Sequence, residues 1–209
     1  MNILAIGAHF DDIELGCGGS LAKHVDKGDD VYLLTITNSG YKDTKGHEIR
    51  NSSKAYEEAN IARNIIGAKE ILCLNLETFH IEFNEKLNSS ILDVIDEKKI
   101  DFIYTHWSGD VHHDHQVVAK SSIHCAKKVP NLLMYKSNWY QSGVTFESNY
   151  FVDITKYWSI KKKAIEAYSS ENIRTDSHWL NFYHNEAINN GYIIGCHMAE
   201  AFVSVRTLI

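Results

Sequence analysis

The chain has 209 residues, of which 44% are hydrophobic and 23% are charged, and its formal net charge is −6 at pH 7. A chain of this length and apolar content can bury one substantial core, so we expect a single domain over residues 1–209. The negative charge argues against a nucleic-acid partner, because phosphates require a basic face. No apolar run reaches the length of a membrane span and no basic leader precedes one, so we expect a cytoplasmic protein.

Short apolar runs alternate with helical patterns in the first 130 residues. The predicted strands are 3–6, 30–37, 71–74 and 101–105, and the predicted helices are 13–28, 49–66, 85–99 and 116–127. A polar loop is predicted over residues 38–48. This alternation is typical of β-α units joined by right-handed crossovers. We therefore predict an α/β, Rossmann-like fold with a mostly parallel sheet flanked by helices.

The pattern after residue 130 is less regular. We expect strands at 132–135, 150–154 and 200–205, and helices at 156–168 and 178–189. An aromatic loop with Trp139 and Tyr140 separates the first two of these strands. Flat aromatic rings suit the face of a sugar, but core packing explains such residues equally well.

The first strand is followed directly by a polar cluster that contains His9, Asp11 and Asp12. Imidazole and carboxylate groups are ligands that suit zinc. The cluster lies between a strand and a helix, which is where open α/β sheets place their ligands. A lone aspartate at this position would equally serve as a helix N-cap, so the cluster needs a partner before it indicates a metal site.

A second cluster, His112-His113-Asp114-His115, follows the fourth predicted strand and opens the next helix. His106 lies at the end of the same strand. Loops at the carboxyl ends of neighbouring parallel strands share one crevice. The two clusters together supply the small set of nitrogen and oxygen ligands that a catalytic zinc site uses while it leaves one position for water.

These motifs resemble the PIG-L/LmbE family of zinc-dependent N-deacetylases. The resemblance is carried by His9-Phe10-Asp11-Asp12, Gly16-Cys17-Gly18-Gly19-Ser20-Leu21-Ala22, Thr37-Asn38-Ser39-Gly40, His112-His113-Asp114-His115 and Ala199-Glu200-Ala201-Phe202. It spans nearly the whole chain, and the two metal motifs are specific as a pair.

The resemblance implies that His9, Asp12 and His115 bind zinc and that Asp11 is the general base. The same ligand set also accepts other divalent metals. His112 would donate a proton to the oxyanion or to the leaving group, although a reading from residues alone allows His113 to exchange roles with it.

Two further aspartates accompany the second cluster. Asp114 is expected to orient an imidazole. Asp110 either orients His112 or caps the following turn.

The substrate-contacting positions depart from the family pattern. The family's arginine falls on Ala55, so we expect Arg50 or Lys54 to replace it, with Arg50 as the predicted substrate contact. The family's later aspartate falls on His80, which we predict as a second substrate contact. Proline is also replaced, by Phe10 in the first motif and by His113 in the second.

The predicted function is a zinc-dependent hydrolase that removes an N-acyl group, with acetyl as the first expectation, from a small amino-sugar-containing substrate. Two alternatives remain: a nucleotide-binding module, suggested by Gly16-Cys17-Gly18 although the third glycine of that fingerprint falls on Leu21, and a non-catalytic metal-binding protein. The sequence leaves a homo-oligomer open.

Overall fold

The computed structural model describes residues 1–208 and has a seven-stranded sheet at its centre. Its strands are β1 (Asn2–Gly7), β2 (Asp30–Thr37), β5 (Glu70–Leu76), β6 (Phe102–His106), β7 (Asn131–Tyr135), β8 (Tyr150–Asp153) and β9 (Ala199–Arg206). The order across the sheet is β5-β2-β1-β6-β7-β9-β8. The first five strands in this order are parallel, and β9 runs antiparallel to both of its neighbours. The predicted α/β fold with a mostly parallel sheet is confirmed.

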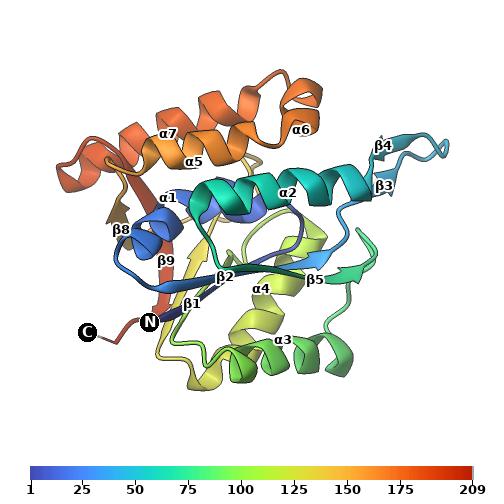
Figure 1. Ribbon diagram of the computed structural model, residues 1–209, viewed down its shortest axis with the longest axis horizontal. Coiled ribbons are helices and arrows are strands. Elements are labelled where there is room, and N and C mark those ends of the chain that lie inside the picture. The colour runs from blue at the N-terminus through green and yellow to red at the C-terminus, as the bar shows by residue number, and fades with distance from the viewer. Residues whose placement is uncertain (209) are drawn as a thin grey trace.

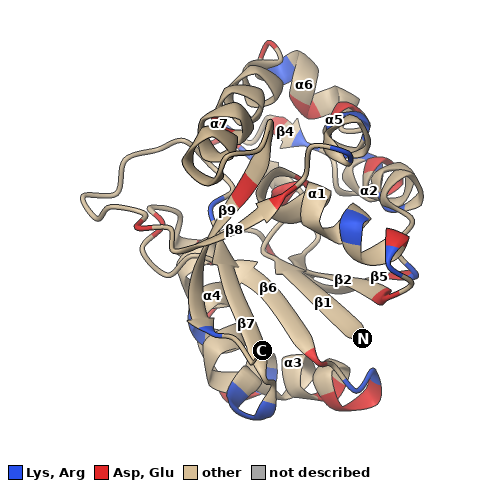
Figure 2. Ribbon diagram, turned by 90° about the vertical axis from the view of Figure 1, so that its left-hand side faces the viewer, with Lys and Arg blue, Asp and Glu red and all other residues tan. Residues whose placement is uncertain are grey.

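Helices cover both faces of the sheet (Figure 1). One face carries α1 (Asp12–Asp26), α2 (Ser52–Ile66), α5 (Trp158–Glu166) and α7 (His178–Ile194), and the other carries α3 (Glu85–Glu97) and α4 (His113–Cys125) with the short 3-10 turn η1 (Ala126–Lys128). Helix α5 packs on α1 and α2, and α7 packs on β9. Figure 2 shows the same layers from the side, with α3 and α4 on the opposite face from the other helices.

The helices on both faces of the sheet explain why its central strands are apolar along their whole length. In β1, Ile3 and Ala5 belong to the core under α1 and α2, whereas Leu4 and Ile6 belong to the core over α3 and α4. Successive side chains of a strand point to opposite faces, so a strand covered on both sides must be apolar throughout. The continuous apolar runs of the sequence are therefore the signature of central parallel strands.

The segment predicted as a polar loop forms a hairpin instead. Its strands are β3 (Tyr41–Lys42) and β4 (Glu48–Arg50), which pair with each other in antiparallel fashion. The predicted helix start at residue 49 is also wrong, because residues 48–50 belong to β4 and α2 begins at Ser52. The side chain of Asn51 accepts the backbone N–H of Lys54 and caps this helix. Arg50 therefore lies in a strand.

One helix, α6 (Ser169–Arg174), was not expected from the sequence. Its first turn is held by Glu58 of α2, whose carboxylate accepts hydrogen bonds from the Ser169 hydroxyl (2.8 Å) and from the Ser170 N–H (2.9 Å). The partner that satisfies these donors lies 111 residues away along the chain. Local sequence patterns do not reveal a cap of this kind.

A buried ion pair ties α1 to the C-terminal half of the chain. The Lys161 ammonium lies 2.6 Å from Glu200 Oε1 and donates to the Leu15 carbonyl at 2.8 Å. The Glu200 carboxylate also accepts the N–H groups of Gly19 and Ser20. Both charges are buried, and removal of one partner from such a pair is strongly destabilising. The position of α1, which follows the first polar cluster, therefore depends on α5 and β9.

Among residues 1–208, no helix is both long and apolar enough to cross a membrane.

The close approach of α1 to β7 gives a stability prediction. A Cβ atom at Gly16 would lie 2.1 Å from Cδ2 of Tyr135, a ring that is fully buried. Gly16→Ala should therefore lower the free energy of unfolding by about 1–3 kcal/mol. Gly18→Ala is the matched control, because its Cβ would meet no atom closer than 3.6 Å, and it should gain roughly 0.5–1 kcal/mol from helix propensity. Urea denaturation measures both, and equal stability of the two variants would contradict the packing.

Candidate metal centre and active site

The two polar clusters meet at one edge of the sheet. Strands β1 and β6 pair in parallel, so the loops that follow them leave the sheet side by side. The ligand atoms of His9, Asp12 and His115 lie within 4.8 Å of one another, and all three residues are buried. The structure thus brings together the three residues that the sequence predicts as metal ligands.

Two aspartates orient the imidazoles of this set. Nε2 of His9 lies 3.0 Å from Asp114 Oδ2, and Nδ1 of His115 lies 3.1 Å from Asp110 Oδ2. An ionised carboxylate only accepts hydrogen bonds, so in the neutral form that can bind a metal the proton of each ring is on the nitrogen that faces its aspartate. In that form the lone pairs of His9 Nδ1 and His115 Nε2 face Asp12, whose oxygens lie 3.3 Å from each nitrogen.

The side chain of Asp110 faces a different histidine ring from the one that the sequence suggested. It pairs with the ring of His115 and not with that of His112, from which it accepts only the backbone N–H. The side-chain amide of Asn138 donates to both oxygens of Asp110 at 2.7 and 2.8 Å. Although burial opposes ionisation, the His115 ring lowers the pKa of Asp110 to about 2. The aspartate is therefore a fixed acceptor.

The electrostatics of the cluster favour a positive charge at its centre. Burial alone would lower the pKa of His115, yet Asp12 and Asp110 raise it to about 10. Two histidines and one carboxylate, buried and backed by second carboxylates, are the donor set of a catalytic zinc site. The residues of this chain therefore fit a divalent cation.

Asp11 is held apart from the ligand set by an unusual backbone. Its φ of 107° is rare for any residue other than glycine, and its carboxylate is not part of the cluster formed by His9, Asp12 and His115. Oδ2 of Asp11 lies 2.7 Å from Nη1 of Arg50, whose Nη2 donates to the Phe10 carbonyl at 2.7 Å. Burial raises the pKa of Asp11 to about 7 against the opposing charge of Arg50. A carboxylate with this pKa is suited to accept a proton near neutral pH.

His112 presents a hydrogen-bond donor to the cavity. Its Nδ1 accepts the backbone N–H of Asp114 at 3.2 Å, so in the neutral ring the proton is on Nε2. Burial, together with the neighbouring His115 and His9, lowers the pKa of His112 to about 4, which favours the neutral ring. The neighbouring His113 is exposed, and its ring contacts the Ile81 carbonyl at 3.0 Å. Of the two histidines, His112 lines the cavity.

A cavity of about 240 Å³ opens beside these groups. Its outer wall includes Glu171 and Arg174 of α6 and Trp179 of α7, which the sequence did not indicate. Glu171 Oε1 lies 3.8 Å from Arg50 Nε, and Arg174 Nε donates to Glu171 Oε2 at 3.0 Å. No local motif marks these residues, because they reach the cavity only through the tertiary placement of α6.

The predicted substrate contacts lie in different places. Arg50 lines the metal cavity, whereas Lys54 is an exposed residue that pairs with Glu57. His80 is exposed and lies outside this cavity, on an adjoining one. His106 is fully buried behind the site, with Nε2 at 3.2 Å from Asp12 Oδ2 and its ring stacked on His115 at 4.0 Å.

Comparison with known proteins agrees with this geometry. A family model described as PIG-L, GlcNAc-PI de-N-acetylase, matches residues 4–126. The chain belongs to the PIG-L family. The matched residues include both polar clusters, at positions 9–12 and 112–115.

Relatives and structural neighbours of this chain include named deacetylases. The uncharacterized deacetylase YaiS of Escherichia coli is 32% identical over 179 residues, which cover 80% of this chain and 90% of that protein. Diacetylchitobiose deacetylase of Thermococcus kodakarensis is 25% identical over 190 residues, covering 81% and 69%. The structure of N,N'-diacetylchitobiose deacetylase from Pyrococcus horikoshii aligns with a TM-score of 0.82 at 22% identity, covering 98% of this chain and 83% of that one.

The ligand assignment makes a prediction about metal content. After loading with Zn²⁺ and desalting, His115→Ala should retain almost no metal, whereas the wild type should hold about one ion per chain. His113→Ala is the matched control, because its ring lies outside the cavity. Elemental analysis gives the metal content, and circular dichroism verifies the fold. Full metal content in His115→Ala would refute the assignment.

Proposed function

We propose that this protein is a zinc-dependent hydrolase that removes an N-acyl group, with acetyl as the expected one, from an amino-sugar-containing small molecule of glycan, nucleotide-sugar or thiol-conjugate metabolism. The observation that carries the proposal is the divergence of two adjacent carboxylates. Asp12 faces the histidine pair, and Asp11 lies beside it in the same cavity without belonging to the ligand set. A binding site alone has no need of the second carboxylate.

The ligands would be His9, Asp12 and His115, and a divalent cation bound there would supply an acidified water and polarise the acyl carbonyl. Asp11 would accept the proton of the attacking water, since its carboxylate lines the cavity beside the ligands. His112 would donate a hydrogen bond from Nε2 to the developing oxyanion and then to the nitrogen of the leaving group, while the proton that Asp11 took from the water would pass to the departing amine. Asp114 and Asp110 would keep the two ligand imidazoles in the required tautomers.

The names of the relatives support an N-deacetylase. YaiS is named a deacetylase and the Thermococcus kodakarensis protein a diacetylchitobiose deacetylase, and both match four-fifths or more of this chain. An acetylated amino sugar is therefore the first substrate to test. Acetate release from a panel of N-acetyl sugars, abolished by a chelator and restored by Zn²⁺, is the direct experiment.

The nucleotide-binding alternative is disfavoured by the glycines that suggested it. Gly16, Gly18 and Gly19 lie inside α1 and not in a loop before it. The space beside Gly16 is filled by the ring of Tyr135, and the space beside Gly19 by Ile154. These glycines permit close packing of a helix, and they form no cradle for a phosphate.

The sharpest test separates the two adjacent aspartates. Asp11→Asn should keep the metal and lose about 10²–10⁴-fold in turnover, the range expected for a general base. Asp12→Asn should lose the metal, because removal of a ligand costs more than the roughly 10–100-fold in affinity typical of an outer partner. Metal content and acetate release are measured on both proteins. Metal loss in Asp11→Asn with retention in Asp12→Asn would reverse the two roles.

A further inference from the structure

A second and larger cavity adjoins the metal cavity. It has a volume of about 670 Å³ and lies between the β3–β4 hairpin, the loop after β5 and the start of α2. The two cavities share four residues, Tyr41, Arg50, Thr78 and Phe79. Figure 1 shows the hairpin projecting beyond the ends of β2 and β5, so this cavity extends the active site outward from the sheet edge.

Aromatic rings connect the two cavities. The ring of Phe79 stacks on His112 with centroids 5.4 Å apart, and its other neighbour, Tyr41, meets it edge-on at 5.4 Å. Phe79 is 49% exposed although it is a large apolar residue. An exposed flat ring at the boundary between two cavities offers a stacking face to a ligand that occupies both.

The position of Phe79 is fixed by the metal centre. Its φ of 69° is unfavourable for a bulky residue, so surrounding contacts must hold it. The backbone N–H of Phe79 donates at 2.8 Å to Asp114 Oδ2, the same oxygen that lies 3.0 Å from His9 Nε2. The carboxylate that orients a metal ligand therefore also places the aromatic ring.

The charges of the second cavity limit what it can hold. Its cations are Lys42 and Arg50, and the two terminal nitrogens of Arg50 already contact Asp11 and the Phe10 carbonyl. Glu48 and Glu77 offset the remaining charge. A diphosphate would meet as many carboxylates as cations here, which disfavours it. The amides of Asn38 and Asn75 and the imidazole of His80, which also line this cavity, are suited to hydroxyl groups.

We propose that the second cavity is a subsite for an uncharged, hydroxyl-rich unit of the substrate, a second sugar ring, which stacks on Phe79 while the acylamino sugar occupies the metal cavity. This inference rests on the proposed function and narrows it. The preferred substrate is then an N-acylated disaccharide or longer glycan, and a nucleotide sugar is a poor one. His80 acts in this subsite and not at the metal.

The test measures equilibrium binding and acetate release in parallel on the Zn²⁺-loaded protein. The three probes are N-acetylglucosamine, N,N'-diacetylchitobiose and UDP-N-acetylglucosamine. The disaccharide should bind more tightly than either other probe and should have the highest kcat/KM. Phe79→Ala should lower the disaccharide-to-monosaccharide ratio roughly threefold to tenfold, the value of one aromatic contact. His80→Ala should lower it about fivefold, the value of one hydrogen bond.

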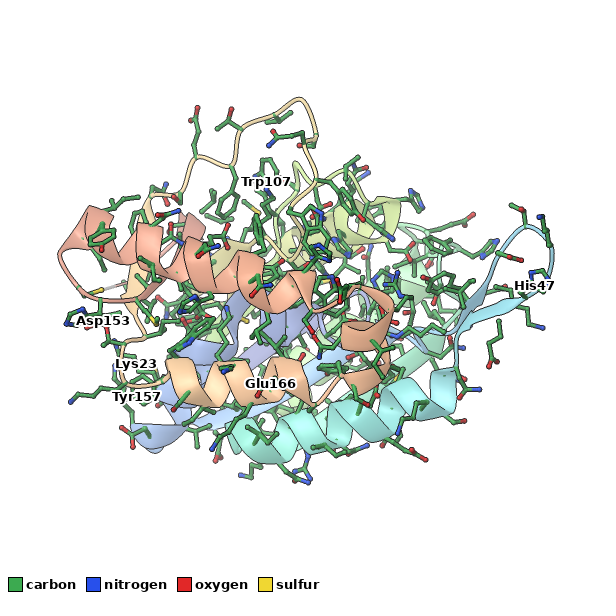
Figure 3. All side chains as sticks on the ribbon, turned by 90° about the horizontal axis from the view of Figure 1, so that it is seen from above. Lys23, His47, Trp107, Asp153, Tyr157 and Glu166 are labelled. Atoms are coloured by element: carbon green, nitrogen blue, oxygen red, sulfur yellow. The ribbon has the colours of Figure 1, made fainter. Side chains whose placement is uncertain are left out.

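Matched controls are available for both variants. Phe83 is also exposed, but it packs against Lys120 and His124 outside both cavities. His47 lies at the tip of the β3–β4 hairpin, away from the body of the molecule (Figure 3). Phe83→Ala and His47→Ala should leave the ratio unchanged.

The outcomes separate this inference from the proposed function. Equal binding of monosaccharide and disaccharide, tighter binding of the nucleotide sugar, or an unchanged ratio in both variants would overturn the subsite. Preferential binding of the disaccharide without release of acetate would support the subsite and overturn the hydrolase. Release of acetate from the monosaccharide and the disaccharide with equal kcat/KM would support the hydrolase and overturn the subsite.

Discussion

The parallel pairing of β1 with β6 is the constraint on which the rest of the site depends. It brings the loop after β1 beside the loop after β6, which begins about a hundred residues later in the chain, and it aligns both loops at one sheet edge. His9 lies in the first of these loops, and Asp12 and His115 lie in the first turns of the helices that follow the two loops. A slip in this register would separate His9 and Asp12 from His115, because none of the remaining strands carries an equivalent group to the same point.

So many ionisable groups can be buried together only because each has a partner. An isolated buried charge costs several kcal/mol, whereas here Asp110 meets a ring and an amide, Asp114 meets a ring and a backbone N–H, and Asp11 meets a guanidinium. The same contacts maintain the strained backbone at Asp11 and at Phe79. The buried charges, the orientation of the rings and the strained backbone therefore depend on the same set of contacts.

The sequence predicted which two polar clusters meet in the fold, but it did not reveal the outer wall of the cavity. The clusters stood out because each follows an apolar run, which indicates both a central strand and the edge at which it ends, and the family resemblance then singled out His9, Asp12 and His115 within them. The hairpin was missed because its strands are two and three residues long. Glu171 and Arg174 were missed because the helix that presents them is capped by Glu58 from another element. Patterns within a few residues of one another could be predicted from the sequence, whereas contacts between residues far apart in the chain could not.

The cap of α6 means that the outer wall of the cavity is positioned by a different part of the fold from the ligand set. A helix of six residues has no independent stability, so its place at the cavity is determined by Glu58 beneath it and by the packing of its neighbours. The exposed Arg174 therefore contributes little to folding, whereas Glu171 is buried near Arg50. Substitution of Arg174 can thus change the charge of the cavity wall while the sheet, the two polar loops and the cap remain the same. This wall residue and the residues around the ligand set are held in place by separate parts of the fold.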